Sequence, residues 1–192
     1  MNDTKRLRYF ILKGKEISMI QGERVHLRIV TRNDLQLLED WANDPRVHSE
    51  YGNFGLRRSG GFEQAFADDG LLSARMGEFL VVAHNDEVVG LVSYHQVGYG
   101  PNEGSRAYNI GISLVEEHRG KSYGVEAQEL LAEYLFSTYS IKRIEATTDI
   151  ENTREQRALE KAGFTREGVL RQAQWRMGQW HDMVVYSKLR GE

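Results

Sequence analysis

The chain has 192 residues, a formal net charge of −3 and no cysteine, with 40% apolar and 28% charged residues. This length suits one domain whose core needs no disulfide, and the lack of cysteine excludes a thiolate nucleophile and a zinc–thiolate site. The charge balance lacks the Lys and Arg excess of a nucleic-acid binder, and no segment reaches the roughly 18 apolar residues of a membrane span. We therefore expect a cytoplasmic protein that binds neither nucleic acid nor membrane and suits a small cationic partner.

The first eighteen residues differ from the rest because basic residues surround one short apolar run. These basic residues are Lys5, Arg6, Arg8, Lys13 and Lys15. We predict that residues 1–18 form a basic N-terminal extension, either a partly ordered arm or an extra edge strand. Residues 19–192 are expected to form a single domain.

Hydrophobic periodicity places the elements of this domain in chain order. Apolar residues alternate over 25–30, which predicts a strand with one buried face. Thr31 and Asp34 have the spacing of a capping box, and the helix they begin should end before Pro45. The remaining prediction is a loop from 46, a short helix near 62–69, strands at 78–84, 88–97 and 106–114, a long helix at 123–138, a strand at 141–148, a helix at 153–162, and strands at 165–176 and 180–189. This order indicates an α/β domain.

The sharpest motif is the segment from Glu117 to Gly124, which lies between a predicted strand and the long helix. A glycine-rich turn at a helix N-terminus presents unpaired N–H groups that bind phosphate. A P-loop is excluded because Val115 stands where its first glycine belongs. The residues alone leave two interpretations open, namely a phosphate site and an ordinary turn with solvated basic side chains.

Several weak motifs in a fixed order resemble the GNAT N-acetyltransferase superfamily, in particular the RimJ/RimL branch of ribosomal-protein N-terminal acetyltransferases. They are the strand at 108–114, the turn Arg119–Gly124 of form [QR]-x-x-G-x-[GA], the helix at 126–136, the strand and loop ending in Asn152, and a helix followed by Gly163-Phe164. The resemblance spans residues 21–190. It implies the GNAT fold, a mixed central sheet of about seven strands splayed in the middle and flanked by about four helices.

The resemblance implies acetyl-CoA as the cofactor. Its pyrophosphate would lie on the turn amides, and its pantetheine arm would pair with an open strand edge and with Asn152. The cofactor-binding residues expected are Ile112, Ser113, Leu114, Arg119, Gly120, Lys121, Ser122, Tyr123, Gly124, Val125 and Asn152. Ser122 departs from the family pattern, which has glycine there, and a side chain at that position demands a compatible backbone angle or shifts the phosphate.

The implied reaction is direct attack of a primary amine on the thioester within a ternary complex. Many members of the family have a Tyr seven residues after the motif Asn as the general acid. That position is Leu159 here, so the general acid is unassigned. Tyr108 and His95 are the catalytic candidates; both residue types are also common as structural residues in strands. No His pair has zinc-ligand spacing, and we predict no metal site.

The family's acceptor groove implies substrate-binding roles for residues near the first helices. These are Trp41, Asp44, His48, Glu50 and Tyr51. A protein N-terminus or a small amine such as a polyamine, amino acid or antibiotic would satisfy this groove. The alternative function is a catalytically weak acyl-CoA-binding sensor or scaffold, and a homodimer is left open.

Overall fold

The computed structural model describes residues 9–11 and 18–192. In this part of the chain it contains one nine-stranded sheet of order β1-β2-β3-β4-β5-β6-β7-β9-β8. The strands are β1 Tyr9–Ile11, β2 Ser18–Gln21, β3 Val25–Ile29, β4 Met76–Ala83, β5 Val88–Gly98, β6 Arg106–Leu114, β7 Arg143–Asp149, β8 Thr165–Arg176 and β9 Gln179–Leu189. The predicted strands are present, and β1 and β2 extend the edge of the sheet beyond the seven expected. Most of the predicted extension, residues 1–8 and 12–17, lies outside the described residues.

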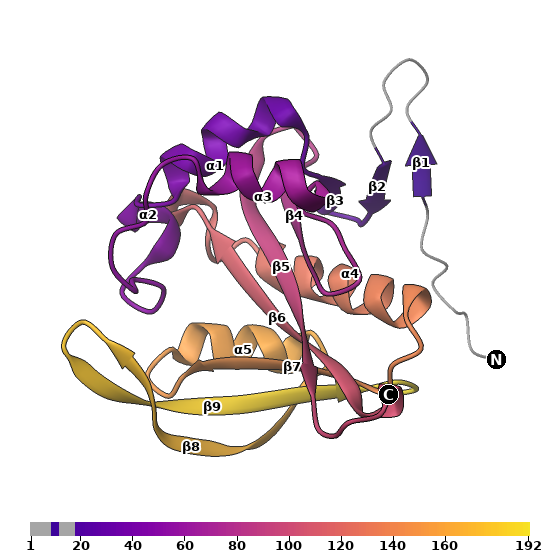
Figure 1. Ribbon diagram of the computed structural model, residues 1–192, viewed down its shortest axis with the longest axis vertical. Coiled ribbons are helices and arrows are strands. Elements are labelled where there is room, and N and C mark those ends of the chain that lie inside the picture. Colours follow the sequence, from indigo (N-terminus) through magenta and orange to yellow (C-terminus); the bar gives the residue numbers. More distant parts are fainter. Residues whose placement is uncertain (1–8, 12–17) are drawn as a thin grey trace.

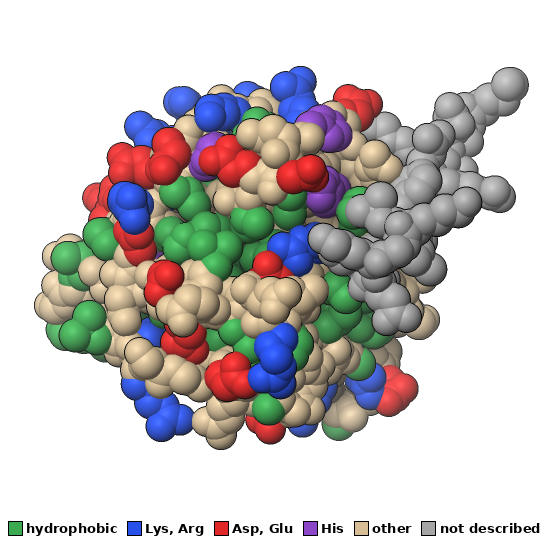
Figure 2. Space-filling view, turned by 90° about the horizontal axis from the view of Figure 1, so that it is seen from above, with side chains coloured by type: hydrophobic (Ala, Val, Ile, Leu, Met, Phe, Trp, Pro, Cys, Tyr) green, Lys and Arg blue, Asp and Glu red, His purple; other side chains and the backbone are tan. Residues whose placement is uncertain are grey.

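Five α-helices are found in the described part of the chain. They are α1 Leu35–Trp41, α2 Pro45–His48, α3 Gly61–Asp69, α4 Tyr123–Thr138 and α5 Thr153–Lys161. Helices α4 and α5 pack on one face of the sheet, and α1 and α3 pack on the other (Figure 1). Figure 2 shows acidic and basic side chains interspersed around an apolar area on the side of α1 and α3.

Strand β4 shows how the two faces form separate cores. Phe79 and Val81 belong to the large core under α4, whereas Leu80 and Val82 belong to the smaller core under α1 and α3. Successive side chains of a strand point to opposite faces, so a strand covered on both sides is apolar throughout. The two cores fix which face of the sheet each later residue occupies.

Helix α2 was not predicted, because Asp44-Pro45 was interpreted only as a helix end. Proline at the first position of a helix lacks only an N–H that would be unpaired anyway. The Asp44 side chain accepts a 2.8 Å hydrogen bond from the Arg46 amide and caps this new turn. The same dipeptide therefore ends α1 and begins α2.

The sheet is split between β6 and β7, as the resemblance implied. These two strands are parallel and pair only from Tyr108 to Ile110 with Ile144 to Ala146. Residues 111–114 of β6 continue to pair with β5 but have no partner on the β7 side within the sheet. An open strand edge therefore lies in the middle of the molecule. Within the described residues, no helix is long and apolar enough to cross a membrane.

Candidate active site

The open edge of β6 exposes the backbone of Ile112. The Val115 amide donates to the Val89 carbonyl at 3.0 Å, so Val115 faces β5. Backbone groups alternate in direction along a strand, and Ile112 and Leu114 therefore face the gap. Leu114 confirms this direction, because its carbonyl accepts a 2.9 Å hydrogen bond from Arg119 Nε outside the sheet. Ile112 can pair with an extended ligand as an added strand would.

The turn before α4 presents free backbone amides. Gly120 and Ser122 have φ of +79° and +65°, so Ser122 adopts the left-handed conformation that glycine takes most readily. Within residues 9–11 and 18–192, the amides of residues 120–125 donate to no other group, and the first helical bond runs from Glu126 N to Ser122 O. These amides and the positive end of a 16-residue helix form an anion-binding arrangement.

Gly124 brings this turn close to the open strand. A Cβ at Gly124 would lie 3.4 Å from Leu114 Cδ1 and 3.5 Å from Ile112 Cδ1. The phosphate-type turn and the open edge are therefore adjacent parts of one site. Tyr123 and Val125, on either side, pack partly buried against the large core.

The two basic side chains of the turn differ in their contacts. The Arg119 guanidinium donates to the carbonyls of Leu114 at 2.9 Å, Arg46 at 2.7 Å and Val47 at 3.1 Å. It fixes the chain around α2 to the end of β6. Lys121 is exposed, and its Nζ lies 3.5 Å from His118 Nδ1. Lys121 is thus the side chain whose charge is available to a ligand.

Asn152 stands where β7 leads into α5. Its Oδ1 accepts a 3.2 Å hydrogen bond from the backbone amide of Glu155 and caps the helix. The backbone N–H of Asn152 donates to Asp149 O at 3.0 Å. Because Oδ1 is used, the Nδ2 group is the part of this side chain that can donate to a ligand carbonyl. The predicted pantetheine contact is compatible with this geometry.

Glu155 lies near the candidate phosphate turn and was not predicted from the sequence. It lies in the first turn of α5, partly buried, and burial raises its pKa to about 7 despite an opposing hydrogen bond with Gln128. Gln128 is buried in α4 and donates to Gly124 O at 3.1 Å, which places Glu155 close to the phosphate-type turn. Leu159 follows one helical turn later and is fully buried, as expected for a core residue.

The two predicted catalytic side chains lie before the point where the strands separate. Tyr108 pairs with Ile144 in the closed part of the sheet, and its hydroxyl donates to Ala74 O at 2.6 Å. Burial raises the pKa of Tyr108 to about 12. His95 is exposed on β5 and pairs with Asn109, two residues before Gly111. Neither residue lies beside Ile112, and a catalytic role for either stays a prediction.

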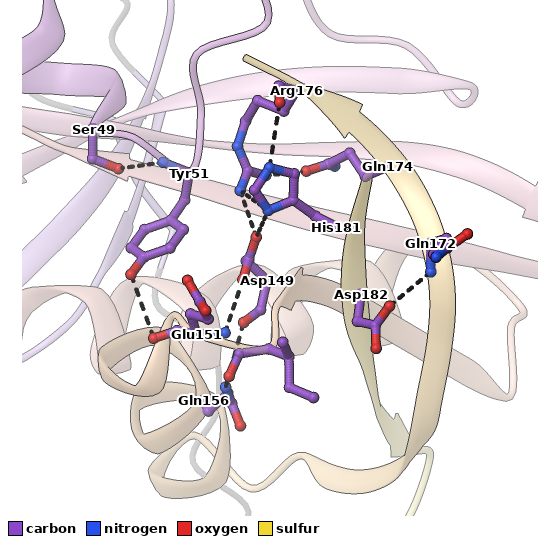
Figure 3. Close-up of polar contacts among 11 residues, drawn as sticks. Ser49, Tyr51, Asp149, Glu151, Gln156, Gln172, Gln174, Arg176, His181 and Asp182 are labelled. Atoms are coloured by element: carbon purple, nitrogen blue, oxygen red, sulfur yellow. Dashed lines mark hydrogen bonds and ion pairs between the residues drawn. The ribbon is translucent and has the colours of Figure 1, made fainter. Parts of the chain in front are cut away.

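The predicted acceptor residue Tyr51 approaches the end of β7 (Figure 3). Its hydroxyl donates to Glu151 O at 3.4 Å, and its ring centre lies 5.8 Å from the Arg176 guanidinium. Arg176 Nη2 and His181 Nδ1 lie 2.5 Å and 3.0 Å from Asp149 Oδ2. Burial alone would raise the pKa of Asp149, but bonds from Arg176 and the Glu151 amide outweigh it and lower that pKa.

The other predicted acceptor residues have mixed surroundings. Asp44 is committed to Arg46, 2.6 Å away, and Trp41 packs against the smaller core. His48 has a buried Nε2 without a partner among the described residues, and burial lowers its pKa. Glu50 is exposed. Among the predicted acceptor residues, Tyr51 thus has contacts at the end of β7, whereas Asp44 and Trp41 are held by Arg46 and by the smaller core.

Two clefts open on the face opposite α4. One of about 590 Å³ is lined by Tyr99, Arg143, Glu145, Thr147, Glu167, Gly168, Val169, Leu170 and Val185. The other, of about 450 Å³, is lined by Asp69, Ser73, Arg75, Met76, His95, Gln96, Val97 and Gly98. Among the described residues, no group of three or more His, Asp or Glu side chains is placed to hold a metal ion.

Comparison with known proteins agrees with this geometry. Residues 24–165 match the family model described as an acetyltransferase (GNAT) domain. An uncharacterized N-acetyltransferase, p20, of Bacillus licheniformis is 29% identical over 174 residues, covering 88% of this chain and 95% of p20.

Solved structures share the fold. The ribosomal L7/L12 α-N-protein acetyltransferase RimL in complex with coenzyme A is 18% identical, with a TM-score of 0.76 over 89% of this chain and 97% of RimL. Spermidine N-acetyltransferase from Vibrio cholerae, in complex with CoA and spermine, is 20% identical, with a TM-score of 0.75 over 88% and 97%. The split sheet, the turn with free amides and the match over most of the chain lead to one conclusion: this chain belongs to the GNAT acetyltransferase family and is an acetyl-CoA-dependent N-acetyltransferase.

Proposed function

We propose that the chain acetylates the primary amine of a small cationic acceptor or of a peptide N-terminus, in a ternary complex with acetyl-CoA. The observation that carries this proposal is the open backbone of Ile112 directly beside the free amides of residues 120–125. An extended chain that ends in a diphosphate fits both features at once. The amides would hold the diphosphate, and the Ile112 carbonyl and the Asn152 side chain would hold the amide-containing arm.

When bound, acetyl-CoA supplies a thioester carbonyl for the amine to attack. In this proposal the Ile112 N–H is the donor that stabilises the oxyanion at that carbonyl. Removal of a comparable donor in other enzymes costs roughly 3 to 4 kcal/mol of transition-state stabilisation. Ile112 is suited to this role because its amide already faces the gap and needs no rearrangement.

An amine acceptor is supported by the substrates of two structural neighbours. An alkyl ammonium has a pKa near 10.4 and must lose a proton before it attacks. The named relatives act on a ribosomal protein and on a polyamine, and both present amines.

The test measures free thiol while the protein is incubated with acetyl-CoA and a panel of amines. The panel contains spermidine, an aminoglycoside, free amino acids and a peptide with a free N-terminus. Thiol release that depends on one class of amine supports the proposal and names the acceptor. Tight CoA binding, seen as a raised melting temperature, without amine-dependent thiol release would instead favour an acyl-CoA sensor.

A further inference from the structure

Three buried side-chain atoms in the described part of the chain have no hydrogen-bond partner. They are Arg143 Nε, His48 Nε2 and Glu78 Oε2. Arg143 uses its two other nitrogens to bind the Glu167 carboxylate at 2.7 and 2.5 Å. A buried carboxylate oxygen without a donor is costly and needs an explanation. Of the three, Glu78 is therefore the residue whose buried oxygen most needs a hydrogen-bond donor from outside the described chain.

Glu78 lies in a row of paired residues that crosses the sheet from β4 to the start of the open edge of β6. The strand registers place Glu78 opposite Ser93 on β5, and Ser93 opposite Gly111 on β6. Directly paired residues of antiparallel strands share a face, and Glu78 has the same parity as Leu80, which faces the smaller core. The row therefore lies on the face opposite α4.

Gly111 places no side chain in this row. It is the first residue of β6 beyond the last pair with β7, and it is exposed although Ile110 beside it is buried. A Cβ at Gly111 would lie 3.1 Å from Ser93 Oγ, tighter than most such contacts. At Gly111, therefore, no side chain of β6 covers Ser93 from the side of the gap.

The charges near Glu78 do not neutralise it. Burial raises the pKa of Glu78, and the positive charge of Arg57 opposes that rise without forming an ion pair within 4 Å among the described residues. Arg57 also lowers the pKa of His48, next after burial. Helix α2, which ends at His48, packs against β6.

The neighbouring carboxylates on this face already have cations. Asp149 is paired with Arg176, and Glu167 is paired with Arg143. Glu145 lies 3.7 Å from Arg143 and accepts hydrogen bonds from Tyr99. Glu78 therefore differs from them in having a buried oxygen to which the described chain supplies no donor.

We propose that Glu78 binds the ammonium group of the acceptor. The inference rests on the proposed function and deepens it, because it assigns the residue that selects a cationic acceptor. An ammonium donates to carboxylate oxygens, and it brings the positive charge for which Glu78 has no ion-pair partner among the described residues. Acceptors without a positive charge should bind poorly.

The deciding variant is Glu78→Gln, which keeps the shape and removes the charge. Its KM for the panel's best acceptor should rise by about 10- to 100-fold, the range for a lost hydrogen bond to a charged group. Its CoA affinity should change by less than about twofold. Its melting temperature should stay equal or increase, because the variant no longer buries an unsatisfied charge. Glu78→Asp, which keeps the charge on a shorter side chain, should give an intermediate KM.

The matched control is Glu63→Gln, an exposed glutamate of α3 paired with Arg32. It should leave the KM for the acceptor and the CoA affinity unchanged. If Glu78→Gln is folded and turns over the acceptor with the wild-type KM, the assignment of Glu78 is overturned while the acetyltransferase proposal stands. If the wild type itself turns over no amine, the proposed acceptor class fails and this inference fails with it.

Discussion

Asp149 and Arg176 form an ion pair of 2.5 Å in which the side chains are 1% and 3% exposed. Asp149 ends β7, three residues beyond the last pair with β6, and Arg176 comes from the end of β8. The pair therefore joins the C-terminal hairpin to the wall of the gap. His181 and Tyr51 contact the same pair from β9 and from the segment after α2.

We predict that Asp149→Asn lowers the free energy of unfolding by about 3 to 5 kcal/mol, because it leaves the buried Arg176 charge unpaired. Urea denaturation at pH 7 measures this change. Glu63→Gln, which breaks the exposed pair with Arg32, should cost less than about 1 kcal/mol. Equal effects of the two variants would contradict a special role for the buried pair.

The same pair predicts a loss of stability in acid. The folded pKa of Asp149 lies below its ordinary value of 3.8, so the unfolded chain binds the proton first. The contribution of this ion pair to the free energy of unfolding is present above the ordinary pKa of Asp149. It is lost as the pH falls through the lowered pKa of the folded state. The stability difference between wild type and Asp149→Asn should therefore shrink below about pH 4. A difference that stays constant down to pH 2 would argue against this pairing.

Gly120 and Ser122 allow a matched test of the turn. A Cβ at Gly120 would meet nothing within 4 Å, so Gly120→Ala acts only through the left-handed backbone. That conformation costs a non-glycine residue roughly 1 to 2 kcal/mol, and CoA affinity should fall by about 5- to 30-fold if the turn relaxes. Ser122→Gly removes the same kind of cost and should leave affinity equal or higher. Calorimetric titration with CoA measures both. Unchanged or tighter binding by Gly120→Ala, or weaker binding by Ser122→Gly, would contradict the role of the turn.

Sequence periodicity predicted the fold well because each face of the sheet leaves a local pattern. Strands β5 and β6 and helices α4 and α5 lie within one residue of their predicted bounds. The backbone part of the site was also predictable, since glycines before a helix mark free amides in the sequence itself. Helix α2 was missed because one dipeptide serves as both an end and a beginning.

The side-chain part of the site depends on contacts that are distant in sequence. Arg119 binds carbonyls that lie 72 and 73 residues earlier, so its charge looked available for phosphate. Glu155 stands in the polar run Arg154-Glu155-Gln156-Arg157, which has the composition of a solvated surface. Glu78 lies near the start of β4, directly before the apolar residues of that strand. Burial of both residues arises from the packing of other segments and leaves no local signal.

Single substitutions of Arg119 and Lys121 should have different effects on stability and on CoA binding. Arg119→Ala removes three hydrogen bonds to backbone carbonyls and should lower the melting temperature at low and high salt alike. Lys121→Ala should leave the melting temperature unchanged and weaken CoA by about two- to fivefold at low salt, because exposed charges are screened at high salt. Thermal melts and CoA titrations at two salt concentrations test both. A salt-independent effect of Lys121→Ala on CoA affinity would contradict this division.

Glu155 predicts a stability change on the alkaline side of the pH range. Burial raises its folded pKa from 4.5 to about 7, so the folded state keeps the proton longer than the unfolded state. The protonated Glu155 carboxyl therefore contributes to the free energy of unfolding in full below pH 4.5. This contribution is lost as the pH rises through 7, by a total on the order of 3 kcal/mol. Glu155→Gln should be as stable as wild type at pH 4.5 and more stable at pH 8.

The ionisation of Glu155 should also affect cofactor binding. Above pH 7 its negative charge lies near the turn that would hold the diphosphate, so wild-type CoA affinity should fall between pH 6 and 8 and that of Glu155→Gln should fall less. Denaturation and CoA titration at each pH provide the measurement, and the exposed Glu151→Gln serves as the control. Parallel pH profiles in wild type and Glu155→Gln would show that this carboxyl is already ionised at neutral pH.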